Sequence, residues 1–425
     1  MSIHVNADNF ARAETDRMFA DIQRDAGGVN TFRHNREPAS IDAQTVIRLN
    51  RDTLYSFAIV DLSEGATLVV PDAGERYLSV MIVDRDHYVR AVLHDAGAYD
   101  LAERAPGADY VLVAARTLVD PDDPDDLARV AEVQDALRLE AASEVAFVGD
   151  EYDPASLDAT RSALLALAAG LRSFERTFGS RDEVDPVRHL IGTAAGWGGL
   201  PVSEASYVGV DPQLPVGFYD LSMHDVPVDA FWSVSVYNAE GYFQPNDEGR
   251  YTVNSVTGHR DEDGVVTVHF TPPGAATEPN SIPLPEGWNY LIRLYRPQPA
   301  FAAGEWHVPD LVRRRDREAE FAADHPTDEG TDAAAGDDVI DEVPRHDDGV
   351  GAGEPDAAGS DGAADAEPGA EPAAAAEPAT DAEAYEGPDV EVSDDVAPPA
   401  NAADGAHRAA DGAHREADTG AAPVA

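Results

Sequence analysis

The pattern of apolar and polar positions predicts a helix first and then a series of short strands. Apolar residues between positions 8 and 23 recur near helical spacing, and Gly27-Gly28 is expected to end the helix. After a loop, apolar and polar residues alternate in short segments separated by turn residues. The predicted strands are residues 45–49, 53–62, 67–70, 77–83, 87–93 and 109–114. Many short strands at this spacing are typical of a β-sandwich or barrel.

A change of period near residue 120 predicts a helical layer. Leucine and valine recur at helical spacing over residues 127–139, and further helices are expected over residues 154–178 and 186–193. Alternation then returns in a second strand-rich block. Its predicted strands are residues 207–210, 217–223, 231–237, 251–256, 265–270 and 288–295.

These elements predict a mainly β (α+β) fold with two β-sandwich or jelly-roll-like modules joined by a helical layer. The expected organisation is an N-terminal helix (1–30), an N-terminal β module (31–120), a helical connector (121–200), a C-terminal β module (201–310) and a tail (311–425). Beyond about residue 313, Ala, Asp, Glu, Gly and Pro dominate the sequence. Since few bulky apolar residues remain to offset the entropy of ordering, this acidic tail is predicted to be disordered.

The charge balance adds a prediction about the environment. The chain of 425 residues has a formal net charge of -51 and no lysine, so its basic side chains are arginine and histidine. Such a composition is typical of proteins that work in very high salt, where the Debye length falls to about 3 Å and crowded carboxylates repel one another weakly. A strongly acidic surface also argues against nucleic acid and anionic membranes as partners.

Other compositional features narrow the chemistry further. The sequence contains no cysteine, which excludes disulfides, thiolate catalysis and thiolate metal sites. No apolar run approaches the length of a membrane span, and the N-terminus lacks the pattern of a secretory signal, so we expect a soluble cytoplasmic protein. There is no Gly-x-Ser-x-Gly elbow and no phosphate-binding glycine loop between a strand and a helix. Histidines are scattered, and we expect neither a metal nor a cofactor.

Two polar clusters at strand ends are the candidate functional positions. Residues 48–55, RLNRDTLY, place two arginines, an amide and a carboxylate beside a strand that is otherwise predicted to be part of the core. Because a buried charge must be paired, Arg51 and Asp52 could form a structural lock; alternatively, the arginines could bind a substrate carboxylate. Residues 231–243 form a strand with small polar residues between large ones, followed by the turn Asn238 to Gly241.

These clusters carry a resemblance to a known family. VIRLNRDTLY (46–55) resembles the signature of a module named domain of unknown function 1254. VDPVRHLIGTAAGWGG (184–199) resembles the passage into its usual partner, domain of unknown function 1214, and residues 231–243, 246–251 and 287–297 are similar to that partner. The resemblance spans residues 31–309, and the acidic, lysine-free composition suggests a haloarchaeal-type member. It implies β-sandwich modules with a helical layer. Some members have a carboxylesterase label, but the family has no agreed catalytic residues.

Two functional hypotheses follow. The first is a hydrolase or small-molecule-binding protein with a site between the two modules, in which a carboxylate acts as base, arginines stabilise an anion and a tyrosine donates a proton. The predicted catalytic residues are Asp52, Arg51, Tyr55, Tyr237 and Glu240. The predicted substrate-binding residues are Arg48, Asn50, Asn238, Trp288 and Arg293. The alternative is a non-catalytic structural, oligomeric or carbohydrate-binding protein. In either case a homo-oligomer is possible.

Overall fold

The N-terminal β module is a sandwich of two antiparallel sheets. The computed structural model of the chain describes residues 2–42, 44, 48–169, 171 and 173–324. The larger sheet has the strand order β1 (Arg33–His34), β2 (Thr53–Asp61), β7 (Tyr110–Leu118), β4 (Leu78–Asp84) and β5 (Val89–Leu93). The smaller sheet has the order β6 (Gly97–Asp100), β3 (Ala66–Val70) and β8 (Arg138–Ala141), and the short helix α2 (Leu101–Arg104) follows β6.

Alternation along β2 gives the larger sheet two buried faces. Ala58 and Val60 point toward the smaller sheet and pack with Leu68 in one core. Phe57 and Ile59 point the opposite way, into a second core that contains residues from the N-terminal helix and from the C-terminal module. Because successive side chains of a strand face opposite sides, a strand buried on both faces loses the apolar–polar alternation and becomes almost continuously apolar.

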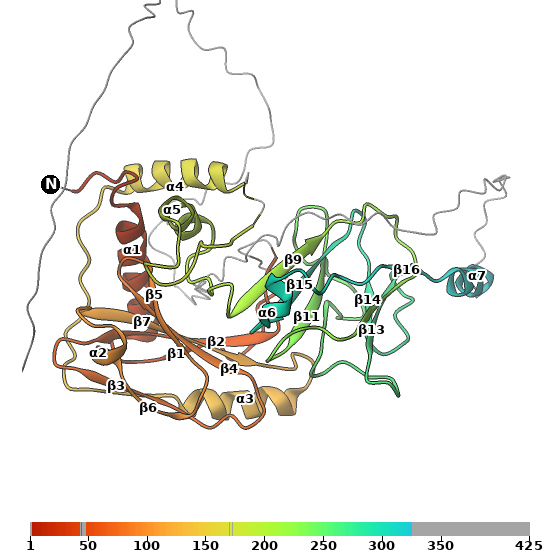
Figure 1. The fold of residues 1–425 in the computed structure, drawn as a ribbon, viewed down its shortest axis with the longest axis horizontal. Helices are drawn as coiled ribbons and strands as arrows, with labels where there is room; N and C mark the ends of the chain where they lie inside the picture. Colours follow the sequence, from red (N-terminus) through yellow and green to blue (C-terminus); the bar gives the residue numbers. More distant parts are fainter. Residues whose placement is uncertain (1, 43, 45–47, 170, 172, 325–425) are drawn as a thin grey trace, which may run out of the picture. The chain divides into compact units, whose positions relative to one another are not determined.

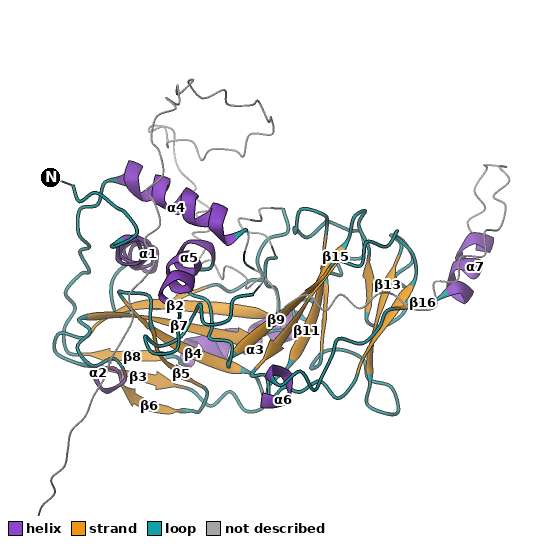
Figure 2. Cartoon of the chain, turned by 45° about the horizontal axis from the view of Figure 1, so that its top comes forward, coloured by secondary structure: helices purple, strands orange, loops and turns teal. Residues whose placement is uncertain are grey.

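Helices cover the second face of the larger sheet. Helix α1 (Phe10–Ala26) lies on it, and α4 (Pro154–Ala168) and α5 (Pro186–Ala195) lie on the same side, whereas β3, β6 and β8 lie on the other (Figure 2). A further helix, α3 (Pro124–Ala136), contacts β7 and lies at the bottom of the view in Figure 1. Helices α3, α4 and α5 each begin with proline after an aspartate whose side chain accepts hydrogen bonds from the first turn. This arrangement satisfies amide groups that have no partner within the helix.

The C-terminal β module is a second sandwich, of two four-stranded sheets. The inner sheet has the order β12 (Thr252–Asn254), β11 (Trp232–Tyr237), β15 (Asn289–Tyr295) and β9 (Ala205–Val210). The outer sheet has the order β14 (Ser281–Pro283), β13 (Val266–Thr271), β10 (Tyr219–Met223) and β16 (Val312–Arg313). Their shared core includes Val234, Ile292, Leu221 and Val268. The short helix α6 (Pro299–Ala302) and helix α7 (Arg315–Asp324) follow the main strands.

The predicted fold class is confirmed, with differences at element boundaries. The structure is mainly β, with two sandwiches and a helical layer. Helix α4 ends at Ala168, well short of the predicted end at 178, and the predicted connector contains β8, which pairs with β3. Ordered elements continue past residue 310 as β16 and α7. Of the predicted strand 45–49, residues 45–47 lie outside the described residues and Arg48 and Leu49 are not in a strand; the predicted disordered tail from residue 325 onward also lies outside them.

A buried histidine fixes the turn between β4 and β5 against α5. His87 is in the left-handed region, with φ 64°, and its Nδ1 lies 2.9 Å from Thr193 Oγ1. Since Thr193 Oγ1 already donates to His189 O, it accepts from His87 Nδ1–H, while His87 Nε2 accepts from Gly198 N at 2.8 Å. The ring is therefore neutral. Burial, and secondarily the nearby His189, lower its pKa well below the usual 6.5.

This neutral histidine should make stability fall on mild acidification. Below about pH 6.5 the unfolded chain binds a proton at His87 and the folded chain does not, so the contribution of this residue is lost as the pH falls. The free energy of unfolding of the wild type, minus that of His87→Asn, is expected to shrink by up to about 1.4 kcal/mol per pH unit between pH 6 and 5. Asparagine tolerates positive φ, and urea titrations at each pH give the comparison. A difference that stays constant with pH would contradict this assignment.

None of the helices in the described ranges combines the length and apolarity that crossing a bilayer requires.

Candidate functional site

The inner sheet of the C-terminal module presents a polar row on the face opposite its sandwich core. Along β11, Trp232, Val234 and Val236 enter that core, so Ser233, Ser235 and Tyr237 face the other side. Register pairs Ser233 with Arg293 on β15 and Ser235 with Thr252 on β12. Strand alternation thus collects hydroxyl groups and one guanidinium on a single surface.

Asp52 of the N-terminal module binds this surface. It lies just before β2 and is completely buried (0% exposed). One carboxylate oxygen accepts from Ser233 Oγ at 2.5 Å, and the other accepts from Thr252 Oγ1 at 3.2 Å. Burial raises the pKa of Asp52, while the nearby Arg293 guanidinium and the two hydroxyl donors oppose that rise. The carboxylate is thereby held by three groups from the other module.

Arg293 is the buried cation of the same cluster. Its Nη1 lies 3.9 Å from Asp52 Oδ2 and donates to Ser235 Oγ at 2.7 Å, and the side chain is also 0% exposed. Its Nη2 donates to Tyr237 Oη at 2.6 Å and to the carbonyl oxygen of Arg48 at 2.9 Å. Tyr237 in turn donates to the carbonyl oxygen of Leu49 at 3.0 Å. The segment before β2 is therefore bound through its backbone as well as through Asp52.

Asn50 extends the cluster to the aromatic residues of the interface. Its Nδ2 donates to Tyr295 Oη at 2.9 Å and to Tyr55 Oη at 3.2 Å, and its Oδ1 accepts from the amide of Asp52 at 2.8 Å. Burial raises the pKa of Tyr295 well above 10, so this phenol stays protonated. We call the set of Asn50, Asp52, Ser233, Ser235, Tyr237, Thr252 and Arg293 the junction cluster.

The predicted lock pairs Arg51 with Asp52, but the structure gives Asp52 another partner. Asp52 has Arg293 as its ion-pair partner. The Arg51 side chain is only partly buried; its Nη1 donates to Ala39 O, and its guanidinium lies 5.6 Å from the centre of the Tyr251 ring. The two adjacent side chains diverge: Asp52 extends to Ser233 and Thr252, whereas Arg51 extends to Ala39 and Tyr251.

Tyr55 borders the junction cluster from β2. Its ring stacks with Phe57, at 5.7 Å between centroids, and the buried Arg116 guanidinium lies 5.4 Å from the ring centre. Arg116 also donates to the carbonyl oxygen of Gly198 at 2.8 Å. Asp52 and Arg293 are fully buried, whereas Tyr55 keeps part of its surface exposed.

Six predicted site residues are not members of the junction cluster. Arg48, Arg51 and Tyr55 lie beside it, and the Arg48 guanidinium is 5.7 Å from the centre of the Tyr237 ring. The other three are Glu240, Asn238 and Trp288. Glu240 is exposed in the turn after β11. Asn238 stabilises that turn, since its Oδ1 accepts from Tyr242 N at 2.9 Å. Trp288 packs in the core between the two sheets of the C-terminal module, 5.3 Å from Phe270 and 5.7 Å from Tyr219. The Trp288 side chain shares the face of Tyr290 and Ile292, opposite to that of Arg293, and therefore lies away from the junction cluster.

Sequence reasoning missed the hydroxyl partners. Ser233 and Ser235 alternate with large apolar residues in β11, and this alternation is a readable sign of a polar face on an otherwise buried strand. Arg116 is a single charged residue within the apolar strand β7, and this position also indicates a polar contact inside the fold. For Thr252, the sequence offers no comparable indication. As for metal ions, no group of three histidine or acidic side chains suited to binding one occurs within the described ranges.

Comparison with known proteins agrees with the two-module organisation. Residues 29–112 match the family model described as "Protein of unknown function (DUF1254)", and residues 215–299 match "Protein of unknown function (DUF1214)". The predicted resemblance is confirmed, and the chain carries a DUF1254 module followed by a DUF1214 module. A search of curated proteins finds no match.

Two solved structures are similar to this chain. One is the crystal structure of the VPA0106 protein from Vibrio parahaemolyticus, with 19% identity and a TM-score of 0.51, covering 72% of this chain and 100% of that one. Another is an uncharacterised protein from Burkholderia cenocepacia, with 14% identity and a TM-score of 0.39, covering 71% of this chain and 86% of that one. At this identity the first likeness concerns the fold.

Proposed function

We propose that this chain is a non-catalytic binding or assembly protein, in which the junction cluster fixes the two β modules as one rigid body. The observation that carries this proposal is the complete burial of Asp52, Tyr237 and Arg293, each 0% exposed. A general base or a proton donor must come within hydrogen-bond distance of the substrate atom that it serves. Side chains with no exposed surface, whose polar atoms already bond to protein groups, suit a structural role.

The junction cluster is well suited to selecting one arrangement of the modules. Asp52 comes from one module, and Ser233, Thr252 and Arg293 come from the other. Any other docking would leave a carboxylate and a guanidinium buried without partners, at a cost of several kcal/mol. Because the desolvation of two charges offsets much of their mutual attraction, the Asp52–Arg293 pair adds little net stability. Its main effect is to favour this arrangement of the two modules over any other.

A substrate screen at molar salt tests this proposal. The net charge of -51 without lysine supports working at high salt, so esters, lactones and amides should be offered to the full chain under those conditions. We expect no hydrolysis above the buffer rate. Turnover by the wild type that is lost in an Asp52→Asn protein with an unchanged circular dichroism spectrum would contradict the proposal.

A second candidate function is the binding of a small carboxylate at the edge of the junction cluster. It is favoured by Arg51 and Tyr55, which flank the junction cluster and are each partly exposed, unlike Asp52 and Arg293. A guanidinium fork matches a carboxylate, and such a contact is strong enough to change affinity about tenfold. Thermal-shift titrations with acetate, succinate and benzoate, comparing the wild type with Arg51→Ala and with the exposed control Arg24→Ala, would detect it. Equal responses of all three proteins would eliminate this candidate.

A further inference from the structure

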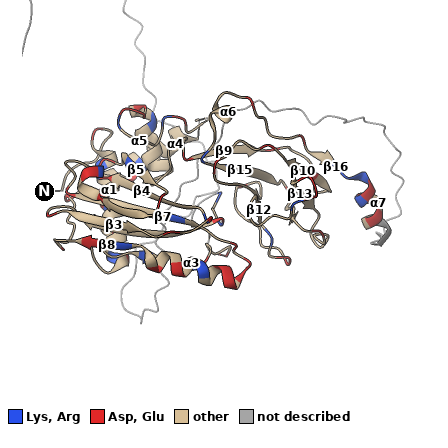
Figure 3. Ribbon diagram, turned by 60° about the horizontal axis from the view of Figure 1, so that its bottom comes forward, with Lys and Arg blue, Asp and Glu red and all other residues tan. Residues whose placement is uncertain are grey.

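A basic segment follows the last long strand of this very acidic chain. Arg313, Arg314, Arg315 and Arg317 occupy four of five positions, in a protein of net charge -51. The segment forms β16 and the first turns of α7, where arginines and acidic residues lie side by side (Figure 3). We call residues 312–321 the edge strap.

The edge strap covers one edge of the outer sheet. Strand β16 pairs with β10 through Tyr219 with Arg313 and Asp220 with Val312, and Arg314 N donates to Phe218 O at 2.8 Å. The strand order β14-β13-β10-β16 makes β10 the terminal strand of this sheet whenever the edge strap is absent. A bare edge strand offers a row of unpaired amides and carbonyls, which is a template for pairing with another chain.

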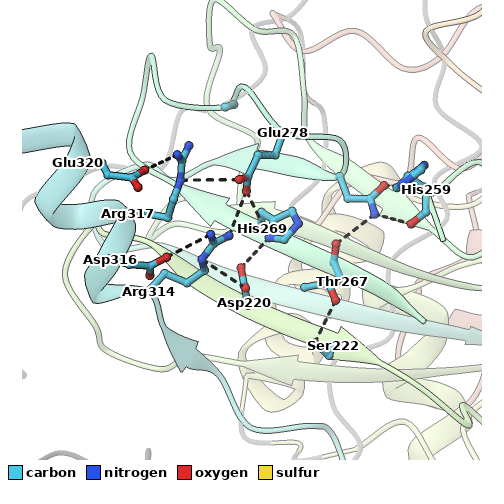
Figure 4. A network of polar contacts seen from close by, with 12 residues as sticks. Asp220, Ser222, His259, Thr267, His269, Glu278, Arg314, Asp316, Arg317 and Glu320 are labelled. Carbon is cyan, nitrogen blue, oxygen red and sulfur yellow. Dashed lines mark hydrogen bonds and ion pairs between the residues drawn. The ribbon is translucent and has the colours of Figure 1, made fainter. Parts of the chain in front are cut away.

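Charge complementarity holds the helical part of the edge strap in place (Figure 4). Arg314 Nη1 lies 3.1 Å from Glu278 Oε2, and Arg317 Nε lies 3.7 Å from Glu278 Oε1. Arg314 Nε also lies 3.7 Å from Asp220 Oδ2, and the other oxygen of Asp220 is 2.6 Å from His269 Nδ1. An acidic site on the outer sheet therefore receives the arginines. One aromatic contact completes it, with Phe321 edge-on to Phe218 at 5.6 Å.

The ion pairs of the edge strap are individually weak. The side chains of Asp220, Arg314 and Arg317 are 22–27% exposed and that of Glu278 is 35% exposed. Ion pairs with this much exposure contribute about 1 kcal/mol or less each and weaken with salt. The strand part has only two residues, and Val312 is 61% exposed. Segments with so little buried surface open locally while the rest of the fold stays intact.

We propose that the edge strap exchanges between two copies of this chain, so that the β10 edge of each copy is covered by residues 312–321 of the other. A second copy supplies the same arginines, the same phenylalanine and the same strand, which the acidic site already accommodates. Exchange of an identical element needs no new surface and closes a symmetric dimer. The edge strap shares no residue with the junction cluster, so failure of this inference leaves the proposed function untouched.

Engineered cysteines test the exchange, because the full chain contains none. One protein carries Val312→Cys, and a second, of larger tag size, carries Asp220→Cys; the two positions face each other across β16 and β10. The proteins are mixed at molar salt under mild oxidation, and mixed disulfides are separated by non-reducing electrophoresis. When the two strands pair in register, the effective concentration of one thiol at the other is far above their bulk concentration. We therefore expect at least about fivefold more mixed disulfide than random collisions would give.

The matched control is Ala319→Cys, an exposed position of the edge strap on α7, outside the strand register, mixed with the same Asp220→Cys protein. A yield from Val312→Cys within about twofold of this control would overturn the proposal, since only collisions would then remain. A second pair, Phe218→Cys with Phe321→Cys, tests the aromatic contact and leaves Asp220 and Glu278, the partners of Arg314 on the outer sheet, intact. This pair must give the same excess of mixed disulfide over the Ala319→Cys control. Circular dichroism must show that each variant is folded.

Discussion

Replacing Arg293 by methionine is expected to lower the free energy of unfolding by about 3–5 kcal/mol. The methionine fills much of the volume but leaves the Asp52 carboxylate, which is 0% exposed, without its cation. The same change removes the donors to Ser235, Tyr237 and the carbonyl oxygen of Arg48. Urea or guanidinium titration of the full chain, followed by tryptophan fluorescence, gives the measurement.

Two further proteins separate lost pairing from lost packing. Arg24→Met removes an arginine that is 64% exposed and paired with Asp21, and it should cost less than about 1 kcal/mol. In the double variant Asp52→Asn and Arg293→Met no charged side chain remains in the junction cluster, so at least about 1 kcal/mol of the loss should be recovered. A double variant less stable than Arg293→Met would mean that Arg293 acts through packing and not through its pairing with Asp52.

Truncation of Phe231 should be comparably severe, at about 3–5 kcal/mol for Phe231→Ala. This ring is 1% exposed, stacks on Tyr295 at 4.1 Å and meets Tyr77 edge-on at 5.2 Å. Tyr77 belongs to the N-terminal module, so the cavity opens at the interface between modules. Trp197 lies with the N-terminal helices and Trp288 in the C-terminal core, so fluorescence follows both modules during thermal and urea unfolding.

The matched control is Phe301→Ala, on the short helix α6. Phe301 is only partly buried, and its nearest aromatic neighbour, Trp306, is 6.3 Å away. We expect this change to cost about 1.5 kcal/mol or less, because less apolar surface is lost and solvent can fill the space. Equal losses from the two truncations would contradict the view that the Phe231 contact links the modules.

Much of the fold could be predicted because local patterns report local structure. The proline after the capping aspartate marked the starts of α4 and α5, and alternation marked most strands. Helix α3 begins at Pro124 with Asp123 as its cap, three residues before the predicted start at 127. The short strands β6, β8 and β14 were missed, since each has only three or four residues and depends on its neighbours for pairing. Helix α4 was overextended because apolar spacing continues past Ala168, where the structure ends the helix.

The candidate site shows the same division. The sequence by itself determined a double β-sandwich body, two module signatures, a strongly negative net charge, and the presence of polar groups at strand ends near residues 48–55 and 231–238. Only the tertiary structure decided which of these groups meet: Asp52 pairs with Arg293 across 241 positions, Arg51 turns to the edge, and Trp288 belongs to another core. The physical reason is that periodicity specifies the face of the strand on which a side chain lies. The partner of that side chain depends on how two sheets from distant parts of the chain dock.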